Sequence, residues 1–396
     1  MTTSKKPNSK EAKLASFYRS HLLENVIPFW MDHGLDRQYG GMLPSLDQAG
    51  NIMDTDKSVW FQGRAGWMFS TLYNTVEHRP EWLAASRSCV EFTRKYCHSP
   101  EGKMWFTVTQ AGAPLRMRRY VFSEAFAAIS YAAYAKATGD PQAALEATKT
   151  FAEFLRFSFT PGLLPPKYEN TRPAKGIGAH MIAIVTAQEL RANLGDIQIS
   201  GQTCTEWVDW NIAEIRRDFM KPEYEALMEE VALDGAVLNH HSGRTLNPGH
   251  ALECAWFIMH EGSLRNKNMY IKVGLKILDW MWARGWDSEF GGLFYFRDLH
   301  NFPVQEYWHD MKFWWPHCEA IIATLLAWTL TGEPKYERMH SLAHDWSFGH
   351  FPDPVHGEWF GYLRRDGTVS QPAKGNIFKG PFHVPRMLWF CNNLLT

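Results

Sequence analysis

Six short glycine-centred segments recur along this chain of 396 residues at intervals of about sixty residues, which indicates an internal repeat. Most of these segments combine strand-like alternation with Gly, Asn or Asp turn residues, a pattern typical of β-hairpins. Their central glycines are Gly40, Gly102, Gly162, Gly235, Gly291 and Gly357. A chain divided in this way is expected to fold as six similar units.

Two kinds of helix are expected around these segments. Helices with mixed charged and apolar positions precede them, at 11–30, 81–97, 141–157 and 335–348. More apolar helices follow them, at 63–76, 123–137, 179–194, 250–260, 316–330 and 384–395. Amphipathic helices belong outside and nearly all-apolar helices inside, so the pattern predicts an all-α, single-domain (α/α)6 barrel over 14–396 with the short β-hairpins at one mouth. An open helical solenoid explains the apolar helices less well.

The net charge and the cysteine content limit the classes of partner and the cellular compartment that are expected for this chain. A formal net charge of -1 gives no electrostatic reason to expect nucleic acid or an anionic membrane as a partner. No apolar run approaches a transmembrane helix, and residues 1–13 read as a disordered polar lead rather than a signal peptide. The six cysteines are scattered without a C-x-x-C pair, which favours reduced thiols in the cytoplasm and argues against a metal site.

The first turns of the six apolar helices should converge on one mouth of the barrel. Each of these helices opens with a charged or titratable group in otherwise apolar sequence. These groups are Arg64, Glu124, His180, His250 with Glu253, His317 with Glu319, and His383 with Arg386. Any one of them would be unremarkable as a buried residue or as a charge favourable to the helix dipole. Six groups in phase predict a shared cavity.

Helical spacing indicates which of these side chains share a face. His250 and Glu253 are three residues apart, as are His383 and Arg386, so each pair projects in one direction. The carboxylate of Glu253 is therefore placed to orient or hydrogen-bond the imidazole of His250.

The stretch FWWPHCEA, which begins at Phe313, supplies part of the expected pocket wall. Trp315 and Glu319 are four residues apart and share a face. Lys312 joins them if the helix starts early, although Pro316 is better suited as its first residue. His317 is two residues from Glu319 and points elsewhere, so we expect it to be structural.

Histidines and arginines around an aromatic cavity suit proton transfer beside a carbonyl group. A neutral imidazole is a usable base near pH 7, and an arginine stabilises the oxyanion that forms. Two histidines on opposite walls would invert a stereocentre, whereas one base would favour aldose–ketose isomerisation. The 18 Trp, 14 Tyr and 25 Phe residues include faces able to pack on sugar C–H groups.

Two other classes of function compete with this interpretation. A glycoside hydrolase needs two carboxylates, and Glu124, Glu253 and Glu319 are available, but the histidines would then have no task. A sugar-binding or regulatory protein would use the aromatic pocket, but the proton-transfer groups would be superfluous.

Several blocks resemble the N-acylglucosamine 2-epimerase family, which includes the renin-binding proteins. The most specific block is HGEWFGYLRRDGTVSQPAKGNIFKGPFHVPRMLW, from His356. Similar blocks are MKFWWPHCEA, NPGHALECAWF, DTDKSVWFQGRAGWMFS and YENTRPAKG. Together they extend from 54 to 389, so the resemblance covers nearly the whole chain.

The resemblance implies an (α/α)6 barrel that epimerises N-acetylglucosamine and N-acetylmannosamine at C2 of the open-chain sugar. It implies that His250 and His383 are the paired acid and base, and that Arg64 and Glu319 are essential pocket residues. The residues expected to contact substrate are Glu124, His180, Glu253, Trp315, Lys312 and Arg386. No cofactor is expected to take part in the chemistry.

The resemblance also implies a homodimer and activation by ATP or another nucleotide. The sequence has no P-loop, and Lys167, Arg172 and Lys175 in KYENTRPAKG are the candidate nucleotide contacts. The family pattern is broken at His180, where close relatives carry proline and related isomerases and free-sugar epimerases use histidine. An aldose–ketose isomerase or a mannose 2-epimerase is therefore the alternative function.

Overall fold

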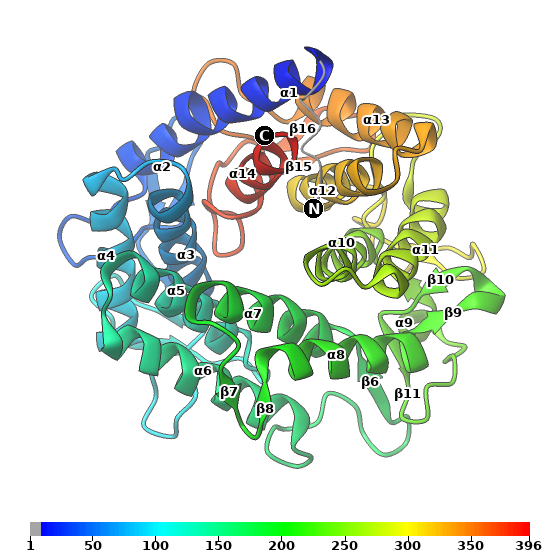
Figure 1. Cartoon of the computed structure of the whole chain (residues 1–396), viewed down its shortest axis with the longest axis horizontal. Helices are drawn as coiled ribbons and strands as arrows, with labels where there is room; N and C mark the ends of the chain where they lie inside the picture. The colour runs from blue at the N-terminus through cyan, green and yellow to red at the C-terminus, as the bar shows by residue number, and fades with distance from the viewer. Residues whose placement is uncertain (1–8) are drawn as a thin grey trace.

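Six apolar helices form an inner ring around the axis of the molecule in this computed structural model, which describes residues 9–396 (Figure 1). The inner helices are α3 (Val59–Thr75), α5 (Phe122–Thr138), α7 (Gly178–Leu194), α10 (Pro248–Leu264), α12 (Trp314–Thr331) and α14 (His383–Leu395). Nearly every residue in the first three turns of α12 is buried, as its unbroken apolar sequence predicts.

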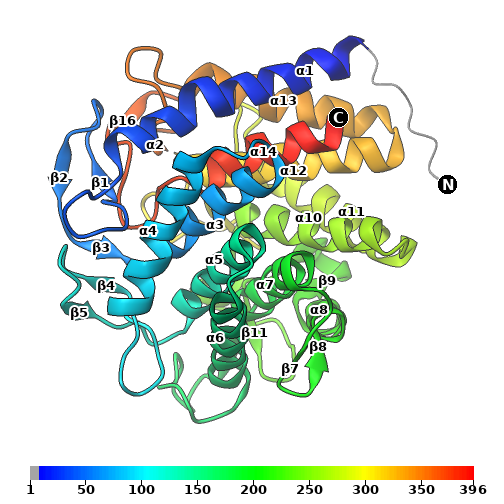
Figure 2. The same ribbon diagram turned by 60° about the vertical axis from the view of Figure 1, so that its left-hand side comes forward.

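An outer ring of amphipathic helices surrounds the inner one and completes the predicted (α/α)6 barrel (Figures 1 and 2). Its members are α1 (Ser9–Ser20) with the π-helical η1 (His21–Val26) and α2 (Ile27–His33), α4 (Pro80–Tyr96), α6 (Pro141–Phe159), α8 (Cys204–Glu214) with the π-helical η2 (Ile215–Phe219), α11 (Asn268–Gly285) and α13 (Pro334–His350). The predicted lead over 1–13 is corrected in part, because residues 9–13 belong to α1 and residues 1–8 lie outside the described chain. None of the described helices is long and apolar enough to cross a membrane.

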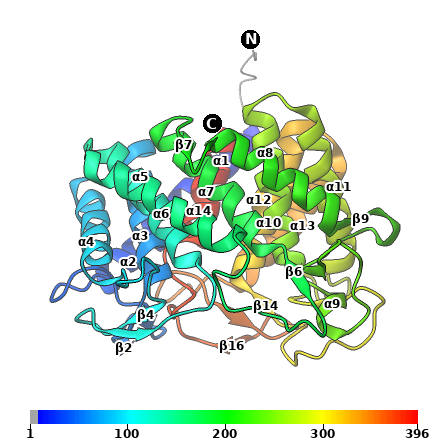
Figure 3. The ribbon, with the colours of Figure 1, turned by 90° about the horizontal axis from the view of Figure 1, so that it is seen from below.

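Short antiparallel strands connect the helices, and most of them gather at one end of the barrel (Figure 3). They are β1 (Ser45–Leu46), β2 (Ile52–Asp54), β3 (Lys57–Ser58), β4 (Thr107–Val108), β5 (Pro114–Arg116), β6 (Ala174–Gly176), β7 (Gln198–Ile199), β8 (Gln202–Thr203), β9 (Met220–Lys221), β10 (Ala226–Leu227), β11 (Glu230–Ala232), β12 (Thr245–Leu246), β13 (Arg297–Asp298), β14 (Lys312–Phe313), β15 (Tyr362–Leu363) and β16 (Val369–Gln371). The remaining elements are two short helices, η3 (Pro222–Tyr224) and α9 (His241–Arg244). All six predicted turn glycines have φ between 75° and 88°, the region that glycine adopts without steric cost.

One glycine segment departs from the predicted hairpin pattern. The stretch after Gly162 forms turns rather than a hairpin, and its strand β6 pairs with β11 of the following repeat. Register joins Gly176 to Glu230 and Ala174 to Ala232. The third and fourth repeats are therefore tied together at the rim.

A buried ion pair stabilises three of the turns in the same way. The pairs are Asp36–Lys57, Asp287–Lys312 and Asp353–Lys374, with N–O distances of 2.7, 3.0 and 3.0 Å. Each aspartate also accepts the backbone N–H groups two and three residues later, which closes its turn. The three lysine side chains are fully buried, so removing one partner would leave an uncompensated charge and cost about 3–5 kcal/mol.

A second recurring contact joins the inner helices to the turns. One side chain in the first turn of three inner helices accepts the backbone N–H of a residue just after the glycine turn. The pairs are Gln62 with Met42, Glu124 with Met104, and His317 with Leu293, at 2.8, 2.7 and 2.9 Å. These side chains therefore face the rim of the barrel.

Glu124 is the weak member of this set, and we expect Glu124→Gln to stabilise the protein. Its second carboxylate oxygen is buried without a partner, and burial raises the pKa of Glu124 to about 7. A raised carboxyl pKa destabilises the fold above the unfolded value near 4.5, with the full penalty reached above 7. The glutamine should therefore raise the free energy of unfolding by about 1–3 kcal/mol at pH 8 and by little at pH 5.

Urea denaturation at the two pH values measures this difference. Gln62→Glu is the matched control, because Gln62 also donates its amide to the Met42 carbonyl at 2.8 Å, and it should lose stability with the opposite pH dependence. An unchanged or lower stability of Glu124→Gln at pH 8 would contradict the argument.

Candidate active site

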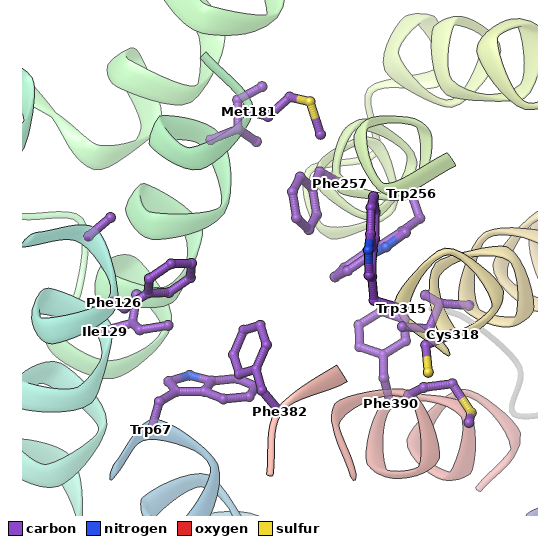
Figure 4. Packing of buried hydrophobic residues seen from close by; sticks show 14 of the residues in the cluster. Trp67, Phe126, Ile129, Met181, Trp256, Phe257, Trp315, Cys318, Phe382 and Phe390 are labelled. Carbon is purple, nitrogen blue, oxygen red and sulfur yellow. The ribbon is translucent and has the colours of Figure 1, made fainter. Parts of the chain in front are cut away.

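A cavity of about 650 Å³ runs along the barrel axis, and all six inner helices contribute to its wall. This volume lies in the range of about 300–1,000 Å³ that is typical of small-molecule sites. Aromatic and aliphatic side chains form most of the wall, as Figure 4 shows for residues of the inner helices. The charged residues and histidines in the wall include Arg64, His250, Glu253, His383 and Arg386.

His383 is held by a buried carboxylate. Its Nδ1 lies 2.9 Å from Oε1 of Glu319, whose side chain is completely buried. A carboxylate only accepts, and it lies closer to Nδ1 than the Arg386 nitrogen at 3.3 Å, so Nδ1 carries the hydrogen and the lone pair is on Nε2. Among the described residues Nε2 has no hydrogen-bond partner, which leaves it available to substrate.

Glu319 also accepts hydrogen bonds from two other side chains. Trp256 donates its indole N–H to Oε2 at 2.7 Å, and Arg386 donates to Oε1 at 2.5 Å. The same Arg386 nitrogen lies 2.9 Å from Glu253 and 3.3 Å from Nδ1 of His383. The oxygen and nitrogen atoms of Glu253, Glu319 and His383 converge within 4.8 Å, as metal ligands do, but the guanidinium already supplies the positive charge among them.

His250 is oriented by a second carboxylate in the same way. Its Nδ1 lies 3.0 Å from Oε2 of Glu229, so Nδ1 donates and Nε2 is again the free nitrogen. Asn247 caps the helix by accepting the His250 backbone N–H at 3.2 Å. The ring of Trp315 packs against both histidines, with centroid distances of 5.0 Å to His250 and 6.0 Å to His383. The two imidazoles therefore meet the same part of the cavity.

The surroundings move the two histidine pKa values in opposite directions. Burial lowers the pKa of His383 well below its ordinary value, and the positive charges of Arg386 and Arg64 add to this effect. Burial also disfavours protonation of His250, but the carboxylates, Glu229 first, outweigh it and raise the pKa of His250. When the pair carries one proton, that proton therefore lies mainly on His250, and His383 is the free base.

Arg64 lies in an aromatic cage above this pair. Its guanidinium carbon is 4.1 Å from the ring centroid of Phe126 and 5.0 Å from that of Phe382. It donates one hydrogen bond, to the Phe378 carbonyl at 3.2 Å, and its Nε is buried without a partner. Burial lowers the pKa of Arg64 to about 9, so it stays cationic at neutral pH. Donors thus remain free for an oxyanion.

Two indole N–H groups in the wall also lack partners. Trp60 and Trp314 line the cavity near the hairpin end, and their Nε1 atoms are buried and unbonded among the described residues. Unpaired buried donors are uncommon in folded proteins. They are suited to binding hydroxyl groups of a ligand.

Six of the predicted site residues line the cavity, and a seventh lies directly behind it. The six are Arg64, His250, Glu253, Trp315, His383 and Arg386. Glu319, which was expected in the wall, lies behind it and contacts His383. His317 is structural as expected, because Nε2 accepts the Leu293 N–H and Nδ1 donates to the Phe313 carbonyl at 2.6 Å.

Three residues predicted to contact substrate do not line the cavity. Glu124 faces the rim and binds the Met104 N–H. His180 points towards the outer helix α8, with Nδ1 2.8 Å from Asn211. Lys312 belongs to β14 rather than to α12, and its ammonium is buried against Asp287. These predictions are corrected, because a position in the first turn of an inner helix can also face the rim or the outer ring.

The candidate nucleotide contacts lie outside this cavity. Lys167 is paired with Glu230, and Lys175 with Asp218 at 2.6 Å, while Arg172 is exposed. Glu229, which comes from the segment between β10 and β11, was not among the residues predicted from the sequence. Its only signal was a pair of adjacent acidic residues in MEEVA, a common surface pattern.

Comparisons with known proteins identify the family of this chain. The family model described as N-acylglucosamine 2-epimerase matches residues 40–379. Curated N-acylglucosamine 2-epimerases of Bos taurus and Homo sapiens are 36% and 35% identical to this chain over 382 residues, covering 94% of it and 89% and 88% of theirs. The chain belongs to the N-acylglucosamine 2-epimerase family. It is therefore an isomerase, as its sequence predicts.

Solved structures of lower sequence identity share the fold. The solved cellobiose 2-epimerase from Bacillus thermoamylovorans B4167 matches with a TM-score of 0.83 and 18% identity, covering 97% of this chain and 99% of that one. A solved D-mannose isomerase matches with a TM-score of 0.81 and 17% identity, covering 95% and 97%. At these identities the likeness supports the barrel architecture alone.

The opposed pKa shifts predict a bell-shaped pH dependence of kcat/KM for this N-acylglucosamine 2-epimerase homologue. Activity should rise with pH as His383 loses its proton, at a pH below the ordinary histidine value near 6.5. It should fall as His250 loses its proton, above that value. Both reaction directions use the form with one proton on the pair, so both should show the same limbs. A profile that keeps rising up to pH 9 would contradict this assignment.

Proposed function

We propose that the protein interconverts N-acetylmannosamine and N-acetylglucosamine by moving a proton at C2 of the open-chain sugar. The observation that carries this proposal is the matched pair His250 and His383. Each has a carboxylate on Nδ1 and a free Nε2, and both pack on Trp315 in one cavity. The full-length likeness to curated N-acylglucosamine 2-epimerases supports the choice of sugar.

The geometry supports a two-base mechanism. One imidazole takes the C2 proton, and the electron pair of the C–H bond forms a C1–C2 double bond while negative charge develops on O1. The guanidinium of Arg64, with donors to spare, stabilises that oxyanion. The other imidazole, already protonated, delivers its proton to the opposite face of C2. Each histidine is the base in one direction and the acid in the other.

An apolar layer beyond the histidines favours an N-acyl sugar over a free sugar. Phe257 and Phe390 lie seven residues after His250 and His383, about two turns deeper on the same helices, and line the cavity with Met181 (Figure 4). The methyl of an acetamido group would be buried there favourably. A free sugar has no methyl group at this position and would leave the apolar surface uncovered.

The alternatives considered from the sequence lose their support. The aldose–ketose isomerase rested on His180, which binds Asn211 instead of facing the cavity. A hydrolase needs two carboxyl groups about 5 Å or more apart that flank the scissile bond. Glu253 and Glu319 instead share one Arg386 nitrogen, and Glu124 faces the rim.

Histidine variants test the two-base mechanism. His250→Asn and His383→Asn should each abolish net epimerisation, with losses of about 100-fold or more. Each variant should still exchange the C2 proton of one epimer with D2O, and the two variants should favour opposite epimers. His180→Asn is the matched control and should keep net epimerisation. Exchange of the same epimer by both variants would replace the mechanism with a one-base isomerase.

Substrate choice is tested by NMR with N-acetylmannosamine, mannose and fructose in D2O. We expect conversion of N-acetylmannosamine to N-acetylglucosamine and little turnover of mannose, because of the apolar layer. Ketose as the main product from mannose, with no conversion of the N-acetyl sugar, would favour an aldose–ketose isomerase over the N-acetyl sugar epimerase.

Three further expectations stay predictions. Activation by ATP or another nucleotide at the segment with Lys167, Arg172 and Lys175 is tested by repeating the NMR assay with and without ATP. Homodimer formation is tested by light scattering of the purified protein, and a cytoplasmic location by fractionation of cells.

A further inference from the structure

Glu229 occupies an unusual place for a residue that contacts a catalytic group. It lies between β10 and β11 at the rim of the barrel, not on an inner helix. Its carbonyl accepts the Ile177 N–H at 3.0 Å, and the following strand pairs with β6. The backbone of Glu229 is thus fixed by the β6–β11 ribbon, and its carboxylate reaches Nδ1 of His250 at 3.0 Å.

We infer that Glu229 is a positioning residue that fixes the tautomer of His250 and holds the shared proton on that side of the cavity. This inference rests on the proposed two-histidine function and adds to it. A neutral imidazole has two tautomers, and only the one with hydrogen on Nδ1 presents a basic Nε2 to substrate. The Glu229 carboxylate accepts but cannot donate, so it selects that tautomer.

The two carboxylates that hold the histidines differ in their own partners. Glu319 is bonded to the Arg386 cation and the Trp256 N–H, so much of its charge is compensated before it reaches His383. Glu229 has no cationic partner among the described residues apart from His250 itself. Its negative charge therefore acts on His250 without being offset by a second cationic side chain.

Other charged groups also face His250, but they do not account for the different protonation of His250 and His383. Glu253 is bound by Arg386 at 2.9 Å, and Glu319 by the same guanidinium at 2.5 Å. On the opposite wall, His383 and Arg64 are neutral and positive respectively, and a positive charge opposes protonation of His250. Glu229 is the group whose removal changes the balance most.

The variant Glu229→Gln separates charge from shape, because an amide oxygen can still accept the Nδ1 hydrogen. With an opposite charge removed at this distance, kcat/KM at pH 8 should fall about tenfold, while at pH 6 it should stay within about twofold of wild type. The basic limb of the profile should move to lower pH by the same amount for the forward and the reverse reaction. The ratio of the two kcat/KM values is fixed by the equilibrium constant of the reaction. Glu229→Leu, which also frees the tautomer, should lose activity at every pH.

Glu230→Gln is the matched control, since Glu230 is the adjacent carboxylate but pairs with Lys167 rather than with His250. It should keep the wild-type pH profile. Glu229→Asp keeps the negative charge beside His250 and should restore part of the basic limb relative to Glu229→Gln. A basic limb unmoved in Glu229→Gln, or moved as far in Glu230→Gln, would overturn the inference.

Nitrogen-15 NMR of labelled histidine gives a readout that does not depend on turnover. In the wild type, His250 should keep hydrogen on Nδ1 at all pH values and titrate at Nε2, and in Glu229→Gln that titration should move to lower pH. Titration at Nδ1 in the wild type would overturn the inference even if the variants fail to fold. Absence of any epimerisation would instead count against the proposed function, while the NMR result would still decide the role of Glu229.

Discussion

The carboxylate of Glu319 is the contact on which the closed barrel and its site both depend. It is completely buried on α12 and accepts hydrogen bonds from Trp256 on α10 and from His383 and Arg386 on α14. Burying a carboxylate is unfavourable unless its charge and lone pairs are satisfied, and here three donors from two other helices satisfy it. The last helix of the chain is thereby fixed against the inner ring. Removing Glu319 would leave Arg386 buried with only Glu253 to balance it.

The buried backbone of the hairpins at the rim of the barrel also needs hydrogen-bond partners. Their turns place backbone N–H groups inside the protein, where each needs an acceptor. Aspartates within the turns and side chains such as Gln62 and His317 in the first turn of the inner helices supply those acceptors. Repeating the arrangement around the ring brings six helix N-termini to one mouth. The proposed acid–base residues His250 and His383 occupy axis-facing positions in the first turns of α10 and α14.

This division explains what could be predicted from the sequence and what could not. The repeat of glycine turns and apolar helices was sufficient for the barrel, and helical spacing correctly separated His317 from the site. Spacing alone could not show in which direction a polar side chain of the first turn points. Whether it faces the axis, the rim or the outer ring depends on the rotation of each helix about its own axis. Glu124 and His180 were misplaced for that reason. Glu229 was missed because its partner is separated by 21 residues and a change of secondary structure.

The different partners of the two carboxylates have a consequence for the reaction itself. In the free protein burial, and after it the charges of Arg386 and Arg64, lowers the pKa of His383, which favours the neutral base. In the proposed mechanism, negative charge develops on O1 of the sugar as His383 takes the C2 proton, and this charge offsets the field of Arg64. The imidazole therefore becomes easier to protonate at the moment when it must hold a proton. The positive charge that helps to lower the pKa of His383 in the resting state is thus the same charge that stabilises the enolate. Its stabilising effect is greatest on the charge distribution of the transition state.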